Sequence, residues 1–291
     1  MSKSSNLAGA LFGLMGMGLF ACSDITVKFL GGGYNPFQII FFAGLMSLPL
    51  IAGLAMADRT AAPLRPKNPG LMALRCVVVL LNGILGTYAF ANLPLAQCYA
   101  IFFTMPIFIT LLSVPVMGEK IDLMRGSAVV AGLVGVIIAL DPGRATLQWA
   151  HAAALLGAIL GAANYVIIRK TGEQERVVVI VLYPVMLQLL VAAMFLPLVY
   201  VPMPFAHLGL TALMAAVSFL GYLSIIAAYR RAPGIVVAPM QYSQIIWAAV
   251  LGAWLFDEVM GNRTVLGAGL IILAGLAIVA KPDRPGAKKP A

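Results

Sequence analysis

The chain has 291 residues, of which 62% are apolar and only 10% are charged, and its mean hydropathy is +1.00. Soluble domains carry about 25% charged residues, so this composition excludes a soluble globular fold and indicates a polytopic membrane protein. The three cysteines, Cys22, Cys76 and Cys98, all lie in apolar segments, which favours buried thiols over a disulfide framework or a metal site.

A helix that crosses a bilayer needs about 20 predominantly apolar residues. By that measure the sequence predicts ten membrane spans, joined by short segments rich in Gly, Pro and charged residues. In chain order the predicted spans are Leu7–Leu30, Pro36–Ala57, Gly70–Ala91, Leu95–Met117, Leu123–Leu140, Ala150–Arg169, Val177–Tyr200, Phe205–Tyr229, Ile235–Phe256 and Val265–Ala280. Residues 282–291 are rich in Pro and Lys and are expected to form a disordered cytoplasmic tail.

The distribution of Lys and Arg predicts the orientation of the chain in the membrane. If the N-terminus is cytoplasmic, 16 of the 19 basic residues fall on the cytoplasmic side. Both ends are therefore expected inside, in the inner membrane of a bacterium, with membrane lipid as the surrounding partner. The same bias explains the net charge of +9 without a nucleic-acid partner. The first apolar segment continues past Cys22 and only Lys3 precedes it, so we expect it to be a span and not a cleaved signal.

The chain contains an internal repeat. Pro94 precedes Glu119 by 25 residues, and Pro233 precedes Glu258 by 25 residues, each pair enclosing one predicted span. We therefore expect two five-helix units, residues 1–146 and 147–281. Because five is odd, the second unit enters the membrane from the opposite side, which predicts two inverted repeats around a central cavity. On this topology Glu119 is cytoplasmic and Glu258 is external.

Two passages carry a resemblance to a known family. One runs from Tyr88-Ala89-Phe90-Ala91-Asn92-Leu93-Pro94 to Gly118-Glu119, and the other from Ala227-Ala228-Tyr229-Arg230-Arg231-Ala232-Pro233 to Asp257-Glu258. The chain resembles the drug/metabolite transporter superfamily, in its ten-span EamA-type branch, and within it the bacterial amino-acid exporters. Asp257 stands where the family usually has Gly. The resemblance implies that the first, third, fourth, sixth, eighth and ninth spans surround the transport pathway.

Ionisable residues inside the predicted spans are costly to bury and are the first candidates for function. Asp24 and Lys28 share a helix face and can form a structural ion pair. The alternative is that Asp24 carries a proton or contacts a substrate amine. Arg75 is expected to anchor the cytoplasmic interface, with carboxylate binding as the alternative. Glu119 and Glu258 either bond backbone amides of the turns that follow them or act in gating and coupling.

Polar and aromatic residues within the spans are the candidates for the substrate pathway, because a small metabolite needs a few hydrogen bonds and an apolar wall. Each candidate has interhelical hydrogen bonding as its alternative role. The candidates are Asn82, Tyr99, Asn164, Tyr222, Tyr242, Gln244 and Trp247. Pro106 and Pro239 interrupt the fourth and ninth spans and are either flexing points of a gate or static kinks.

The expected function is secondary transport by alternating access, exporting small metabolites and above all amino acids, with aromatic and hydrophobic ones foremost. The alternatives are export of hydrophobic or cationic drugs and a channel-like membrane protein. We expect no enzymatic activity, because the spans contain neither paired aspartates nor a membrane histidine beside a nucleophile. No cofactor or metal is expected, and one chain contains both halves of the pathway, so a monomer can function.

Overall fold

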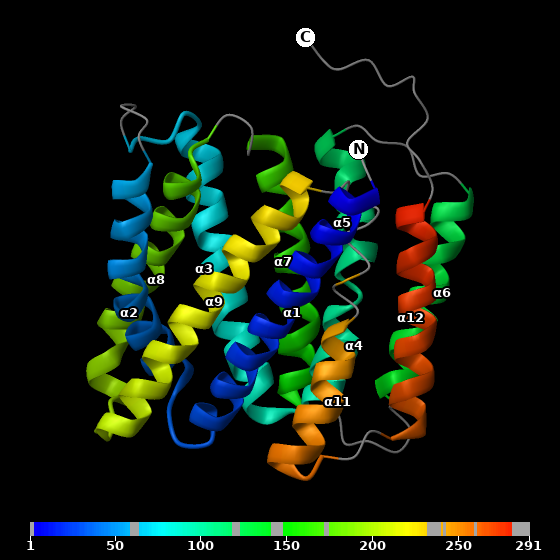
Figure 1. Cartoon of the computed structure of the whole chain (residues 1–291). Helices are drawn as coiled ribbons and strands as arrows, with labels where there is room; N and C mark the ends of the chain where they lie inside the picture. The colour runs from blue at the N-terminus through cyan, green and yellow to red at the C-terminus, as the bar shows by residue number, and fades with distance from the viewer. Residues whose placement is uncertain are drawn as a thin grey trace.

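The computed structural model describes residues 3–58, 64–117, 123–140, 148–171, 175–231, 240, 243–258 and 261–280. Within these ranges the regular structure is helical, and the helices stand side by side as an upright bundle (Figure 1). In chain order the helices are α1 (Lys3–Gly31), α2 (Pro36–Ala57), α3 (Pro69–Asn92), α4 (Leu95–Phe102), α5 (Met105–Met117), α6 (Leu123–Leu140), α7 (Trp149–Thr171), α8 (Val177–Val199), α9 (Phe205–Arg231), α11 (Ser243–Phe256) and α12 (Asn262–Ala280). α1 begins and α12 ends at the same end of the bundle, in agreement with a chain whose two ends lie on one side.

Seven segments of the described chain are long and apolar enough to cross a membrane. They correspond to α1, α2, α3, α4 together with α5, α7, α8 and α9. The other three predicted spans contain α6, α11 and α12, of which α11 is described over 14 residues, fewer than a span needs. The chain is a multi-pass membrane protein, and the count of ten spans stays a prediction.

The predicted span Leu95–Met117 is divided into two helices, α4 and α5, by a turn at Phe103 and Thr104. The buried Thr104 hydroxyl donates to the Ile101 carbonyl at 2.6 Å, and its backbone N–H donates to the same carbonyl at 3.0 Å. Pro106 is the second residue of α5, where the first helical turn does not require its missing N–H. The expected interruption is therefore present, and it lies on the N-terminal side of the proline.

Helices from the two halves of the chain pack against one another. The most extensive pairings are α1 with α9, α3 with α7, α2 with α8, and α6 with α12. The α6–α12 pair depends on small residues, because a Cβ at Gly135 would lie 2.9 Å from the Gly267 carbonyl oxygen. A central cluster of buried side chains joins α3, α4 and α7, with Leu95 and Ala154 both fully buried.

Buried polar contacts fix the ends of several helices. Gln38 is fully buried at the start of α2, and its side-chain amide donates to the Val201 carbonyl at 2.6 Å and accepts from the Val201 N–H at 2.9 Å. At the opposite end of the bundle Arg176 pairs with Asp58 at 2.9 Å. These contacts satisfy polar groups that a membrane interior could not solvate.

Candidate substrate-binding site

A cavity of about 390 Å³ lies among α1, α3, α4, α5 and α11. Its lining combines one carboxylate, several neutral polar side chains and a set of aromatic rings. The lining residues are Phe20, Asp24, Val27, Asn82, Gly83, Gly86, Thr87, Phe90, Tyr99, Phe102, Met105 and Gln244. The volume and this mixture of polar and apolar walls suit a small metabolite.

Asp24 is the one charged side chain that lines this cavity within the described residues. The Tyr99 hydroxyl on α4 donates a hydrogen bond of 2.5 Å to Asp24 Oδ2 on α1. Tyr99 is only 3% exposed, so its ring is held by packing and fixes the carboxylate in place. The other carboxylate oxygen is not used by this bond, and a carboxylate in an apolar cavity attracts a positively charged group.

Aromatic rings form the wall on the α3 and α4 side of Asp24. Phe90 packs edge-on against Tyr99 with ring centroids 5.5 Å apart, and it stacks on Phe102 at 5.4 Å. Ring faces carry partial negative charge and stabilise a nearby cation. Asp24 and these rings therefore both favour a positively charged occupant of the cavity.

The helix positions of Asn82 and Gly86 explain why both reach the cavity. They lie four residues apart on one face of α3, and Phe90 continues that face one turn later. α7 packs behind them without side-chain bulk, since a Cβ at Gly157 would lie 3.6 Å from Asn82 Oδ1. Phe90 and Thr87 were missed from the sequence, although the spacing of Asn82 and Gly86 already pointed to Phe90.

The structure brings Asn82, Tyr99 and Gln244 together with Asp24 around one cavity, and their role in a substrate pathway stays a prediction. Tyr222 does not line this cavity; it lines a neighbouring cavity among α1, α2, α3, α8 and α9.

The other sequence candidates are placed differently. Asn164 lies on α7 with its buried Oδ1 lacking a partner among the described residues, and it lines neither of the two cavities. Trp247 is 39% exposed and packs toward Gly18, with 3.5 Å between its ring and the position of a Cβ there. Tyr242 lies outside the described residues.

Of the two alternatives for Asp24 and Lys28, the structural ion pair between them is wrong. Lys28 Nζ instead pairs with Glu258 Oε1 at 2.7 Å and donates to the Leu93 carbonyl at 2.6 Å. Four residues along a helix bring Asp24 and Lys28 to one face, but Glu258 at the end of α11 offers Lys28 a carboxylate from another helix.

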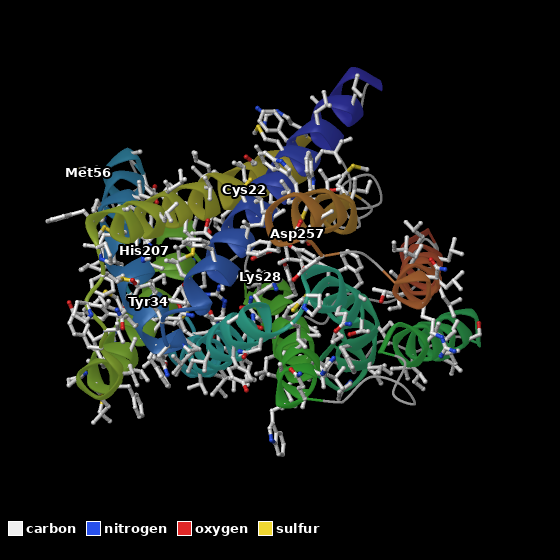
Figure 2. The ribbon with its side chains drawn as sticks, turned by 90° about the horizontal axis from the view of Figure 1, so that it is seen from below. Cys22, Lys28, Tyr34, Met56, His207 and Asp257 are labelled. Atoms are coloured by element: carbon white, nitrogen blue, oxygen red, sulfur yellow. The ribbon has the colours of Figure 1, made fainter. Side chains whose placement is uncertain are left out.

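Glu258 also contacts the start of α4. Its Oε2 accepts from the Leu95 N–H at 2.8 Å, while residues 259 and 260, which begin the turn that it was expected to bond, lie outside the described residues. Lys28, Leu93, Leu95 and Glu258, which we call the closure cluster, thus join α1, α3, α4 and α11. Figure 2 views the bundle from below, and in it Lys28 lies beside Asp257, the residue before Glu258.

The structure describes only one of the three remaining gating candidates. Pro106 is described by its backbone alone, in the first turn of α5, and Glu119 and Pro239 lie outside the described residues. In the part of the chain that the structure describes, no group of three or more His, Cys, Asp or Glu side chains could hold a metal ion.

The EamA-like transporter family matches this chain twice, over residues 7–140 and 148–280. The S-adenosylmethionine uptake transporter of Rickettsia bellii is 22% identical over 273 residues, which are 92% of each chain. The pseudopaline exporter CntI of Pseudomonas aeruginosa is 27% identical over 277 residues, covering 93% of this chain and 95% of the relative. An uncharacterized transporter of Helicobacter pylori is 26% identical, covering 94% of this chain and 92% of its own.

A protein of known crystal structure superposes with a TM-score of 0.64 at 17% identity, covering 95% of this chain and 96% of its own. At this identity the likeness shows a shared fold alone. Of the three relatives named above, one is an uptake transporter, one is an exporter and one is uncharacterized, so they set no direction of transport. The narrower expected similarity to amino-acid exporters is not confirmed by them.

Proposed function

Since this chain belongs to the EamA-like transporter family and is a membrane transporter, we propose that it carries small amino-acid-derived metabolites across a bacterial inner membrane. Asp24 binds their positively charged group and the aromatic wall holds their apolar part. The single observation that carries the proposal is the Asp24 carboxylate, held by Tyr99 at 2.5 Å beside a cavity of about 390 Å³. Free amino acids and S-adenosylmethionine both present a cationic group to such a site.

Asp24 also suggests how transport is coupled. A carboxylate inside the membrane is costly unless a cation or a proton neutralises it. Substrate and proton therefore compete for Asp24, and each crosses the membrane in place of the other. In a bacterium whose outside is more acidic than the cytoplasm, this exchange moves the substrate outward, which is the proposed direction.

The helix pairings support alternating access between two inverted repeats. If α1, α2, α3 and α6 correspond to α7, α8, α9 and α12, exchanging the halves converts the α1–α9 pairing into the α7–α3 pairing. The α2–α8 and α6–α12 pairings each convert into themselves.

The helix directions agree with this exchange. Ala150 and Ala154, near the start of α7, pack with Phe90 and Leu93 near the end of α3, where Lys28 near the end of α1 also lies. α7 therefore runs opposite to α1, as an inverted repeat requires.

The closure cluster supports an arrangement that is closed at the predicted external end. Lys28 and Glu258 are 12% and 19% exposed in their side chains, and together with the Leu93 carbonyl and the Leu95 amide they occupy the end toward which α1 and α11 run. For a substrate to leave at this end, the contacts between α1, α4 and α11 must open. We assign Lys28 and Glu258 a gating role on this basis.

Counterflow into proteoliposomes tests the proposal. Purified protein is reconstituted with one unlabelled compound inside, and entry of the same labelled compound is followed without an ion gradient, for a panel of amino acids and S-adenosylmethionine. Saturable counterflow of cationic or zwitterionic compounds is expected. No counterflow by folded protein for any compound of the panel would refute the proposed substrate class.

The role of Asp24 is tested by Asp24→Asn, which should lower counterflow about tenfold or more because it removes the charge that binds the substrate cation. Asp257→Asn is the matched control. It removes an exposed carboxylate at a residue with φ of 53°, a backbone conformation that Asn tolerates. Equal effects of the two substitutions would remove Asp24 from the mechanism.

The second candidate function is export of hydrophobic cations, which the same carboxylate and aromatic wall would accept. Tetraphenylphosphonium, which has a positive charge and no carboxylate, separates the two candidates. Counterflow of this compound without counterflow of any amino acid would favour the second candidate. Flux without saturation or counterflow would indicate a channel.

A further inference from the structure

A second cavity, of about 420 Å³, lies among α1, α2, α3, α8 and α9. It shares part of its wall with the Asp24 cavity at Gly83 and Thr87, and Gln188 stands at this boundary, where a Cβ on Gly83 would meet its side-chain amide. Most of its other lining side chains are apolar, among them Ile39, Pro184 and Phe219. This cavity therefore has room for a second occupant with a largely apolar body.

Arg75 is the one charged side chain that lines this second cavity within the described ranges. It is only 7% exposed, and its Nη1 donates to the Ile180 carbonyl of α8 at 2.5 Å. Its Nε is buried and has no hydrogen-bond acceptor among the described residues, and no described carboxylate pairs with the guanidinium. A buried charge that is left with an unmet donor is destabilising unless a partner of opposite charge joins it.

Neutral polar side chains also line this cavity and add hydrogen-bonding groups to the charge of Arg75. Tyr222 and Ser218 line it. The Tyr222 hydroxyl can donate to an anion, whereas the Ser218 hydroxyl already donates to Ser23 Oγ at 2.6 Å. Gln188 contributes an amide whose Nε2 already donates to the Val79 carbonyl at 3.2 Å. A guanidinium with an unused donor, together with the Tyr222 hydroxyl, recognises an oxyanion, since arginine binds carboxylate and phosphate through its planar set of N–H groups.

We propose that Arg75 and its cavity form a binding site for an organic oxyanion with an apolar body, either a carboxylic acid or the phosphate group of a lipid. The site is distinct from the Asp24 cavity. It has the opposite charge, and Arg75 lies eight residues before Gly83 on α3, which at 1.5 Å per residue is about 12 Å. The chain therefore offers an anion-binding and a cation-binding cavity that adjoin along α1 and α3.

Equilibrium dialysis of the purified full-length protein in an uncharged detergent tests this site without any transport. The probes are radiolabelled 4-phenylbutyrate and the matched amine 4-phenylbutylamine. We expect saturable binding of the carboxylate that Arg75→Gln weakens about tenfold or more. Arg65→Gln, which removes an exposed arginine near the start of α3, is the matched control and should leave binding unchanged. Equal binding of the carboxylate to both variants would overturn the proposal.

Two further variants keep the test decisive if Arg75→Gln does not fold without its bond to Ile180. Arg75→Lys keeps the positive charge and should retain part of the carboxylate binding. Ala43→Phe fills the cavity from α2, leaves the Arg75 guanidinium unaltered, and should abolish carboxylate binding. Full carboxylate binding to folded Ala43→Phe would place the anion elsewhere and overturn the proposal.

The source of the oxyanion is identified by competition. If dihexanoyl phosphatidylglycerol displaces 4-phenylbutyrate and dihexanoyl phosphatidylcholine does not, the natural occupant is an anionic lipid. If neither displaces it, the occupant is an organic acid. The amine probe tests the proposed function separately, because its binding should depend on Asp24 and not on Arg75. If one probe does not bind, the result for the other probe still tests the other cavity.

Discussion

Substituting Glu258 by Gln should loosen the predicted external end of the bundle by an amount that the closure cluster allows us to estimate. Glu258 Oε1 lies 2.7 Å from Lys28 Nζ, and Oε2 accepts from the Leu95 N–H at 2.8 Å. Gln keeps an acceptor for Leu95 and loses the charge that binds Lys28. A hydrogen bond to a charged group contributes about 1.5–3 kcal/mol, and 1.4 kcal/mol is a factor of ten, so the externally open population should rise about 10- to 150-fold.

The buried thiol of Cys98 reports this opening. Cys98 is fully buried one turn after Leu95, so a membrane-impermeant maleimide reaches it only when α4 separates from α1 and α11. In a Cys22→Ser, Cys76→Ser background, Glu258→Gln should raise the rate of Cys98 modification by the same factor as the open population. Asp257→Asn, which alters an adjacent exposed carboxylate, should not.

A double-mutant cycle with Lys28→Gln separates the ion pair from other effects. If Lys28 and Glu258 act as a pair, the second substitution adds little to the first, because the interaction is already lost. Additive effects of the two substitutions, or equal Cys98 rates in Glu258→Gln and Asp257→Asn, would refute the reasoning.

Three other predictions follow from described contacts. Tyr99→Phe removes the hydrogen bond to Asp24 and should weaken substrate affinity in counterflow about 3- to 10-fold, with little change in thermal stability. Unchanged affinity would argue against Tyr99 as the residue that positions the carboxylate. Gly135→Ala should destabilise the protein in detergent by about 1–3 kcal/mol, because the added methyl meets backbone of α12, whereas Gly269→Ala meets nothing within 4 Å and should be neutral in the same melt. Gln38→Leu should lower the free energy of unfolding by about 2–4 kcal/mol, since both backbone groups that it serves lose their partner; a melt like that of the unaltered protein would contradict this.

The helices could be located from the sequence because apolar runs and their polar boundaries are local features. α2 has the predicted bounds Pro36–Ala57, since a proline can occupy the first helical turn and the polar residues after Ala57 end the apolar run. α8 ends one residue earlier than predicted. The division of the fourth span was expected, but its place was not, because the Thr104 side-chain bond that forms the turn depends on the folded backbone.

The candidate site was predictable to the extent that polar residues are rare in the spans. Asp24, Asn82, Tyr99 and Gln244 stood out by their chemistry alone, and the structure gathers them around one cavity. The direction in which each helix faces was not predictable, because helices that are apolar on all sides carry no amphipathic pattern. Tyr222 was therefore assigned to the same pathway although it lines the neighbouring cavity.

The partner of Lys28 shows the limit of local spacing. Asp24 is four residues away, and Glu258 is 230 residues away, yet the structure pairs Lys28 with Glu258. A spacing rule compares positions within one helix, whereas α1 and α11 meet only in the folded bundle. The repeat that predicts an external position for Glu258 was the nearest available signal of this contact.

The closure cluster has a consequence for how abruptly the proposed gate at the predicted external end opens. One carboxylate supplies both the acceptor for Leu95 and the counter-charge for Lys28, and the preceding residue, Asp257, is held at φ of 53°. Because both oxygens belong to one carboxylate, a movement of Glu258 away from this site separates it from Lys28 and from Leu95 at once. We therefore expect the proposed gate to open cooperatively, with α1 and α4 released from α11 in the same step.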